Sequence, residues 1–348
     1  MTGSLRSARL EVDDALAADA LFQERGWTDG LPIVPPTEER VGECLAWAHL
    51  EPDEVLGVEP VRRRTITAEK VAINAVMAGC LPPYFPVVAT AVQAMCEEPF
   101  LLHGCTSSTG GSAPLLVVNG PVRREIGMHT THNALANGSR ANATIGRALR
   151  LVLLNVLGSV PGGLDRSTLG HPGKLGFCVA EDEEDSAWTP LAEERGVPAG
   201  ASAVTVLACA PPRQVMNEWT EDPEEIAETF AAEMRANMLH YSVWPGNYAL
   251  VVPKQLRELF VAAGWQKRDL REYVHRAARV RRSEWRRVGK ARIAAGDDDR
   301  ELAALASPDD LLVVAAGGPA GGFATVIPPW FGSKSRAVTR ALGLCVTC

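Results

Sequence analysis

The chain has 348 residues, of which 46% are hydrophobic and 22% are charged, and its formal net charge is −7 at pH 7. These proportions are typical of a globular protein and exclude a disordered or fibrous chain. A nucleic-acid partner is not expected, because phosphate binding draws its affinity from a basic surface. The acidic N-terminal residues and the short apolar runs indicate neither a signal peptide nor a membrane span, so we expect a cytoplasmic protein with no membrane partner.

The first third of the chain predicts helices separated by proline-rich segments. Helices are expected at 12–26 and from 37 to about 50, with an extended segment at 27–36 between them. Thr67 is placed to N-cap a helix at 68–79, and a further helix is expected at 87–97.

The pattern changes to alternating strands and helices after residue 110. The apolar run 114–118 predicts a buried strand, and 141–157 predicts a deeply packed helix. Further strands are expected at 175–180, 203–209, 247–252 and 310–316, and further helices at 223–239, 254–263, 268–279 and 333–343.

This order predicts an α/β fold built of Gly-rich strand–loop–helix units. Residues 115–149 are echoed by 311–342, and residues 172–174 by 245–247, but the two echoes occur in opposite order along the chain. Two pseudo-symmetric halves and two unrelated halves therefore remain alternatives. We expect an N-terminal helical and extended segment at 1–60, a first α/β half at 61–200 and a second at 201–348.

Three segments carry a resemblance to known proteins. The segments 26–32 (GWTDGLP), 72–82 (AINAVMAGCLP) and 139–148 (SRANATIGRA) are similar to those of a largely uncharacterised bacterial family. Some of its members carry a generic thiol-redox label or occur near proteins with a selenocysteine-type Gly-Ser-Cys motif. The resemblance implies one architecture for most of the chain and assigns no catalytic residue.

The densest group of reactive and polar residues is the segment 103–112, HGCTSSTGGS. Small hydroxyl residues among glycines expose backbone N–H groups that can hold a carboxylate or phosphate, although a flexible connection between packed elements has the same composition. The residues expected to bind a small anionic substrate are Thr106, Ser107, Ser108, Gly110, Gly111, Ser112, Asn119, Arg140 and Arg147.

A thiol is the expected reacting group. Cys105 lies two residues after His103, whose imidazolium would stabilise a thiolate, and a small buried cysteine is the alternative. Cys345 and Cys348 form a C-x-x-C pair that would act as a resolving dithiol and exchange with an external dithiol reductant, and a metal-binding pair or an inert tail is the alternative. The first hypothesis is therefore a thiol-dependent enzyme, redox or nucleophilic, that acts on a small anionic substrate.

Two other functions fit the same residues. His103, His129 and His132 would form a divalent-metal site in a lyase or hydrolase. A non-catalytic anion-binding protein is the other alternative. The sequence holds no dinucleotide fingerprint, so no nucleotide cofactor is expected, and it leaves open whether the chain forms a homo-oligomer.

Overall fold

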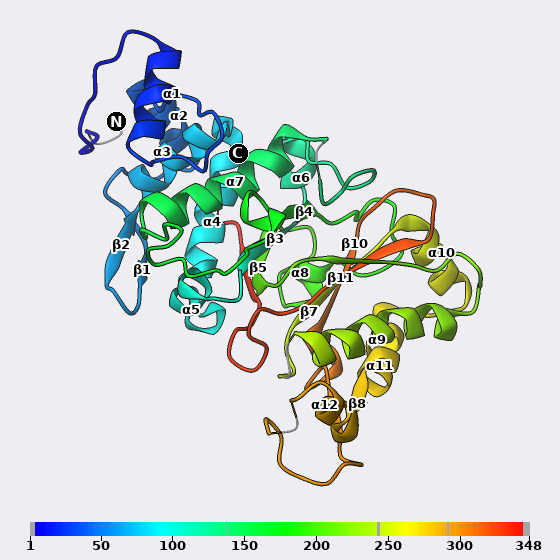
Figure 1. Cartoon of the computed structure of the whole chain (residues 1–348). Coiled ribbons are helices and arrows are strands. Elements are labelled where there is room, and N and C mark those ends of the chain that lie inside the picture. Colours follow the sequence, from blue (N-terminus) through cyan, green and yellow to red (C-terminus); the bar gives the residue numbers. More distant parts are fainter. Residues whose placement is uncertain (1–3, 137, 242–243, 291, 344–348) are drawn as a thin grey trace.

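The computed structural model describes residues 4–136, 138–241, 244–290 and 292–343 (Figure 1). Within these residues the chain forms an α/β fold with two four-stranded sheets and two short hairpins. The first sheet has the order β12 (Val338–Ala341), β5 (Ala203–Cys209), β3 (Ala113–Asn119) and β4 (Cys178–Ala180). The second has the order β10 (Leu311–Ala315), β7 (Tyr248–Val252), β11 (Phe323–Ile327) and β6 (Arg213–Met216).

The two sheets share one pattern of strand directions. In the first sheet β3 runs parallel to β4 and antiparallel to β5, and β5 runs antiparallel to β12. In the second sheet β7 runs parallel to β10 and antiparallel to β11, and β11 runs antiparallel to β6. Read in this order, β3 corresponds to β7 and β4 to β10.

The sheets exchange one strand each. β5 leads through Pro211 and Pro212 into β6 of the second sheet, and β11 leads through Pro328 and Pro329 into β12 of the first. The two crossings meet where the amide of Ala210 donates to the carbonyl of Pro328 at 3.0 Å. The expected boundary at residue 200 therefore falls just before β5, a strand that pairs with β3.

The C-terminal part of the chain differs from the secondary structure predicted from the sequence. The helix predicted at 333–343 is wrong, because β12 occupies residues 338–341 as an edge strand beside β5. The segment 311–342 thus lacks the strand–loop–helix order of 115–149. The echo between them also aligned β10 with β3, whereas the strand directions match β10 with β4.

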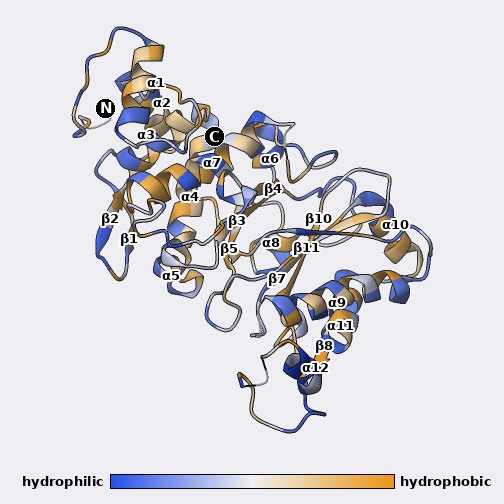
Figure 2. Cartoon of the chain, viewed as in Figure 1, coloured by the Kyte–Doolittle hydropathy of each residue, from blue (hydrophilic) through white to orange (hydrophobic). Residues whose placement is uncertain are grey.

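The sheets pack face to face between two layers of helices. Leu115 and Val117 of β3 meet Ala249 and Val251 of β7 in an apolar layer between the sheets. The outer face of the first sheet is covered by α4 (Phe85–Met95) and α7 (Arg140–Asn155), and α3 (Ala68–Ala78) packs on both of these helices. The outer face of the second is covered by α9 (Pro223–His240), α10 (Lys254–Ala262) and α11 (Lys267–Ala277). The strands of the second sheet are accordingly mostly hydrophobic (Figure 2).

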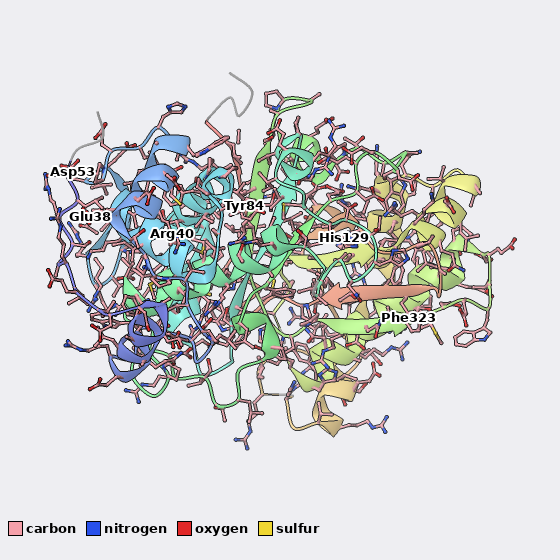
Figure 3. All side chains as sticks on the ribbon, turned by 90° about the horizontal axis from the view of Figure 1, so that it is seen from above. Glu38, Arg40, Asp53, Tyr84, His129 and Phe323 are labelled. Carbon is pink, nitrogen blue, oxygen red and sulfur yellow. The ribbon has the colours of Figure 1, made fainter. Side chains whose placement is uncertain are left out.

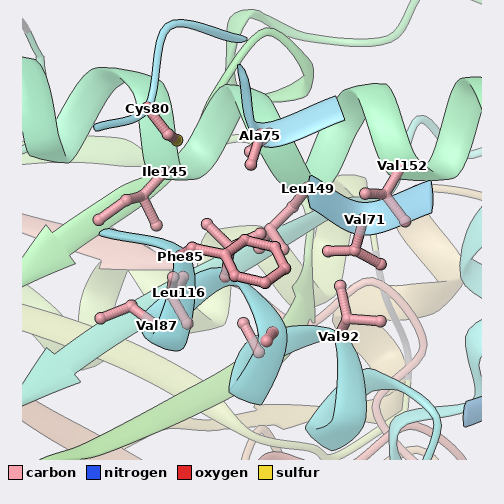
Figure 4. Packing of buried hydrophobic residues seen from close by; sticks show 14 of the residues in the cluster. Val71, Ala75, Cys80, Phe85, Val87, Val92, Leu116, Ile145, Leu149 and Val152 are labelled. Carbon is pink, nitrogen blue, oxygen red and sulfur yellow. The ribbon is translucent and has the colours of Figure 1, made fainter. Parts of the chain in front are cut away.

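Apolar spacing explains the helices that flank the first sheet. Phe85 of α4 is fully buried and lies in one cluster with Val71 of α3 and Leu149 of α7 (Figure 4). The expected helices at 68–79, 87–97 and 141–157 are confirmed within two residues at each end. Thr67 does hold the N-cap position of α3, but its side chain makes no capping hydrogen bond.

The N-terminal part and the remaining short elements complete the fold. The hairpin β1 (Val55–Glu59) and β2 (Arg64–Thr67) follows α1 (Ala15–Glu24) and α2 (Glu38–Trp47). The other short elements are α5 (Leu102–Ser107), α6 (Val122–Glu125), α8 (Leu191–Glu194), α12 (Arg282–Arg287), the hairpin β8 (Arg279–Arg281) and β9 (Glu301–Ala303), and the 3-10 turns Pro82–Tyr84, Glu98–Phe100, Pro172–Lys174 and Pro308–Asp310. No helix in the described ranges combines the length and apolar character needed to cross a bilayer.

Candidate functional site

The loop 108–112 connects α5 to β3, and segments from distant parts of the chain converge on it. The indole Nε1 of Trp330 donates to Ser108 Oγ at 2.6 Å, and the Tyr241 hydroxyl donates to the carbonyl of Gly110 at 3.1 Å. The amide of Thr168 donates to the carbonyl of Thr109 at 3.0 Å. In Figure 1 the red segment that follows β11 passes beside α5. The loop therefore lies where both halves of the chain meet.

Two of the glycines in this region are required by close contacts. Gly111 has φ +69°, and a Cβ added there would lie 3.0 Å from the Cα of Gly170. A Cβ at Gly104 would lie 2.7 Å from the Trp330 ring. Larger residues would strain the backbone at the first position and displace the indole at the second. The glycines thus let Trp330 and the 165–174 loop pack directly on the main chain.

The loop presents backbone donors without protein acceptors. The amides of Thr109, Gly111 and Ser112 donate to no described residue, whereas the amide of Gly110 donates to Ser108 Oγ at 2.9 Å. Unpaired N–H groups close together in one loop are suited to hold an anion. Thr106 and Ser107 do not contribute as expected, because both hydroxyls donate to the carbonyl of His103 within α5.

A small cavity of about 10 Å³ lies behind the loop, and its polar lining residues include Cys105, Ser112, Arg150, Asp165 and Lys174. Its volume matches a single water molecule. Lys174 Nζ lies 2.7 Å from Asp165 Oδ2, and Arg150 Nη2 lies 3.3 Å from the same oxygen. Burial raises the pKa of Asp165, but hydrogen bonds from Lys174 and Ser167 outweigh it and hold the pKa below its ordinary value. The cluster thus places two cations against one carboxylate, a net charge of about +1.

The structure does not support the expected activation of the Cys105 thiol. Its side chain is only 5% exposed, and Cys105 Sγ lies 3.0 Å from Ser112 Oγ. Burial raises the pKa of the thiol to about 11, although the Ser112 hydrogen bond and Lys174 act to lower it. His103 cannot supply an imidazolium contact because its ring is bound to Glu59. The resting thiol is therefore protonated at neutral pH.

His103 instead forms a dyad with a buried carboxylate. Its Nδ1 lies 3.0 Å from Glu59 Oε1, and Glu59 is fully buried while the His103 side chain is 31% exposed. The amides of Val61 and Arg62 donate to the two Glu59 oxygens and fix the carboxylate. Because a carboxylate only accepts, Nδ1 carries the hydrogen and Nε2 is left as the basic nitrogen of the neutral ring. A carboxylate that orients an accessible imidazole in this way is typical of general acid–base pairs.

The three histidines of the predicted metal site are not brought together. The backbone of His129 is held by Asn142 of α7, and the His132 ring packs against Gly318. Figure 3 shows His129 near the middle of the molecule, away from the N-terminal segment that precedes Glu59. Among the described residues, no group of three or more His, Cys, Asp or Glu side chains is arranged to hold a metal ion.

Asn119 is also separated from the loop. It ends β3, whereas Ser112 precedes the first residue of the strand, so about 20 Å of extended chain lies between them. Asn119 is buried, and its Nδ2 donates to Glu181 Oε2 at 2.7 Å and to Glu183 Oε1 at 2.8 Å. Its role is to join carboxylates at the opposite end of the first sheet.

The two arginines expected to bind substrate are engaged elsewhere. Arg147 binds Asp29 through Nε and Nη2, both at 2.8 Å, and Nη2 also donates to the carbonyls of Leu31 and Pro32. It thus fastens the segment 29–32 to α7. Arg140 is exposed, and its Nε donates to the carbonyl of Gly79 at 2.9 Å. Arg150, one helical turn beyond Arg147, is the α7 arginine that reaches the cavity.

Most of the side chains around the loop are not among the site residues predicted from the sequence. Lys174 belongs to the Gly-containing segment 165–174, whose composition was a usable signal, and the prolines and glycine that flank Trp330 were another, whereas nothing local marked Glu59 or Tyr241. Cys345 and Cys348 lie outside the described residues. A scan against models of known protein families finds no match, and a search among curated proteins also finds none.

Proposed function

We propose that the chain is an enzyme that acts on a small anionic substrate held at the loop 109–112. The observation that carries the proposal is the set of amides of Thr109, Gly111 and Ser112, which donate to no described residue. A carboxylate or phosphate oxygen would accept these donors, and the left-handed conformation of Gly111 is one that side chains rarely adopt.

The charges behind the loop support an anion. Lys174 and Arg150 share the single carboxylate of Asp165, so the cluster retains an excess positive charge. The surroundings are largely buried, which strengthens the attraction compared with an exposed pair. Trp330 adds an aromatic wall over Gly104 and Gly110 that would exclude water from the bound group.

The chemical step we favour is proton transfer by His103. Glu59 fixes the ring through Nδ1, and the side chain is 31% exposed, so Nε2 would take a proton from the substrate or return it. This chemistry needs no activated thiol and agrees with the protonated state of Cys105. Because His103 does not line the cavity behind the loop, the substrate would have to extend from the loop amides along α5 to reach it.

Thiol-dependent chemistry at Cys105 is the second candidate. It is favoured by the Ser112 hydrogen bond and by the cations Lys174 and Arg150, all of which act to lower the thiol pKa. Burial opposes them, so this route requires the thiol to lose its proton after the loop opens. Cys345 and Cys348, with an external dithiol reductant, would belong to the redox form of this candidate.

Anion binding is tested first by titrating sodium phosphate and sodium oxalate separately into ¹⁵N-labelled protein. We expect saturable amide shifts at Gly111 and Ser112, and at least fivefold weaker binding in Lys174→Gln. Lys254→Gln is the matched control, because Lys254 pairs with Asp185 on the surface of the second half. Absence of saturable shifts with both anions would contradict the proposal.

Turnover is tested with a panel of small carboxylates and phosphate esters followed by proton NMR. Activity that His103→Gln abolishes and Cys105→Ser retains supports proton transfer, and the reverse supports the thiol candidate. Binding with no turnover throughout the panel would favour a non-catalytic anion-binding protein.

A further inference from the structure

A second cavity, far larger than the one behind the loop, lies under the N-terminal segment. Its volume is about 860 Å³, which is within the range of small-molecule sites. Its walls are mainly apolar and come from the N-terminal segment, α1, α3 and the end of α7, with Leu5, Leu10, Phe22, Ile73, Met77 and Val156 as the main apolar side chains. None of the residues expected to bind substrate lines it.

The N-terminal segment 5–12 forms one wall of this cavity and is held by polar contacts. The Glu69 carboxylate accepts the amides of Arg6, at 3.0 and 3.1 Å, and of Ser7, at 2.8 Å. Ion pairs join Arg6 to Asp53 and Arg9 to Glu38, and Figure 3 shows Asp53 and Glu38 beside this segment. Exposed ion pairs of this kind contribute little to stability, so Glu69 is the main fastening.

Asn155 is a polar lining residue suited to a ligand. Asn155 of α7 donates through Nδ2 to Asn74 Oδ1 at 2.7 Å and to the carbonyl of Trp27 at 2.9 Å. Its Oδ1 accepts no hydrogen bond from the described chain, although Asn155 lines the cavity. A hydrogen-bond donor on a bound molecule would satisfy this oxygen.

The charges around the cavity exclude an anion as the preferred ligand. Arg9 and Lys70 are outnumbered by Glu11, Glu38 and Glu69, so the lining carries a net charge of about −1. This sign is opposite to that of the cluster behind the loop. We therefore propose that the cavity under residues 5–12 binds an uncharged, mostly apolar small molecule that donates one hydrogen bond to Asn155.

The test uses N-phenyl-1-naphthylamine, an uncharged apolar fluorophore with one N–H donor. We expect saturable binding to the full chain with one site and a micromolar dissociation constant. Ile73→Trp, which fills the cavity from α3, should weaken binding at least tenfold. Val261→Trp makes a large substitution on the exposed face of α10 and should leave the affinity unchanged. The N-methylated probe, which lacks the donor, should bind at least threefold more weakly.

A kinetic measurement tests the role of the covering segment. Glu69→Gln should speed probe dissociation about fivefold, whereas Asp53→Asn, which breaks the exposed pair with Arg6 and does not line the cavity, should change it less than twofold. Equal affinities for wild type and Ile73→Trp would overturn the proposal. It also fails if light scattering shows a dimer and the probe binds only after dilution separates the copies, since the cavity would then be a contact surface between chains.

Discussion

Replacing Arg147 by alanine should destabilise the protein strongly, because the side chain fastens the segment 29–32 to α7. Arg147 is 14% exposed and Asp29 is 3% exposed, and two bonds of 2.8 Å join them. Charged hydrogen bonds contribute about 1.5–3 kcal/mol each, and loss of one partner from a buried pair costs about 3–5 kcal/mol. We therefore expect Arg147→Ala to lower the free energy of unfolding by about 4 kcal/mol.

Urea unfolding followed by circular dichroism measures this change. Arg340→Ala is the control, because its pair with Glu97 at 3.3 Å has both side chains more than 40% exposed and should cost less than about 1 kcal/mol. Burial raises the pKa of Asp29, but Arg147 outweighs it and leaves the pKa below its ordinary value. The pair therefore stabilises the fold above the unfolded-state pKa, about 3.9, and this stability is lost as the pH falls through the folded pKa. Arg147→Ala should reduce the decrease of the free energy of unfolding at acid pH. If Arg147→Ala lowers the free energy of unfolding by no more than Arg340→Ala does, the reasoning is refuted.

Three further outcomes follow from the loop and the cavity behind it. Gly111→Ala should lower the free energy of unfolding by about 2 kcal/mol in urea denaturation. The loss should exceed that of Gly264→Ala, because Gly264 also has positive φ but has open space around it. Equal losses for the two variants would mean that the chain near Gly170 moves to make room for the new methyl group. Iodoacetamide should label native Cys105 more slowly than the less buried Cys96 at pH 8, with a rate that climbs toward pH 11, and peptide mapping that finds Cys105 modified first would contradict its burial. Trp330→Phe should cost about 1 kcal/mol through loss of the bond to Ser108, and an unchanged urea midpoint would show that this bond contributes nothing.

The regular elements with strong apolar patterns could be predicted from the sequence. The strand expected at 203–209 coincides with β5, because its residues are buried on both faces and read as one continuous apolar run. β12 could not be predicted in the same way. Its Thr339, Arg340 and Ala341 are partly or fully exposed at a sheet edge, so no alternation distinguishes this strand from a helix end.

The candidate site was predictable only in part, because its partners are distant along the chain. The composition of 103–112 marked the loop, and the structure joins it to Trp330 and Tyr241, more than 100 residues away. The closeness of His103 and Cys105 in the sequence wrongly suggested that the two side chains are in contact. They are two residues apart, yet the imidazole binds Glu59 and the thiol faces Ser112 inside the fold.

The exchange of β6 and β12 has a consequence for how the protein is made. The first sheet contains β3 and β4 early in the chain, but its edge strand β12 ends only at residue 341. During synthesis one edge of β5 therefore stays unpaired until residues 338–341 have left the ribosome. Unpaired sheet edges template pairing with other chains, and long-range strand pairing slows folding. We expect a nascent chain that stalls before residue 338 to be prone to aggregation and to require a chaperone over β5.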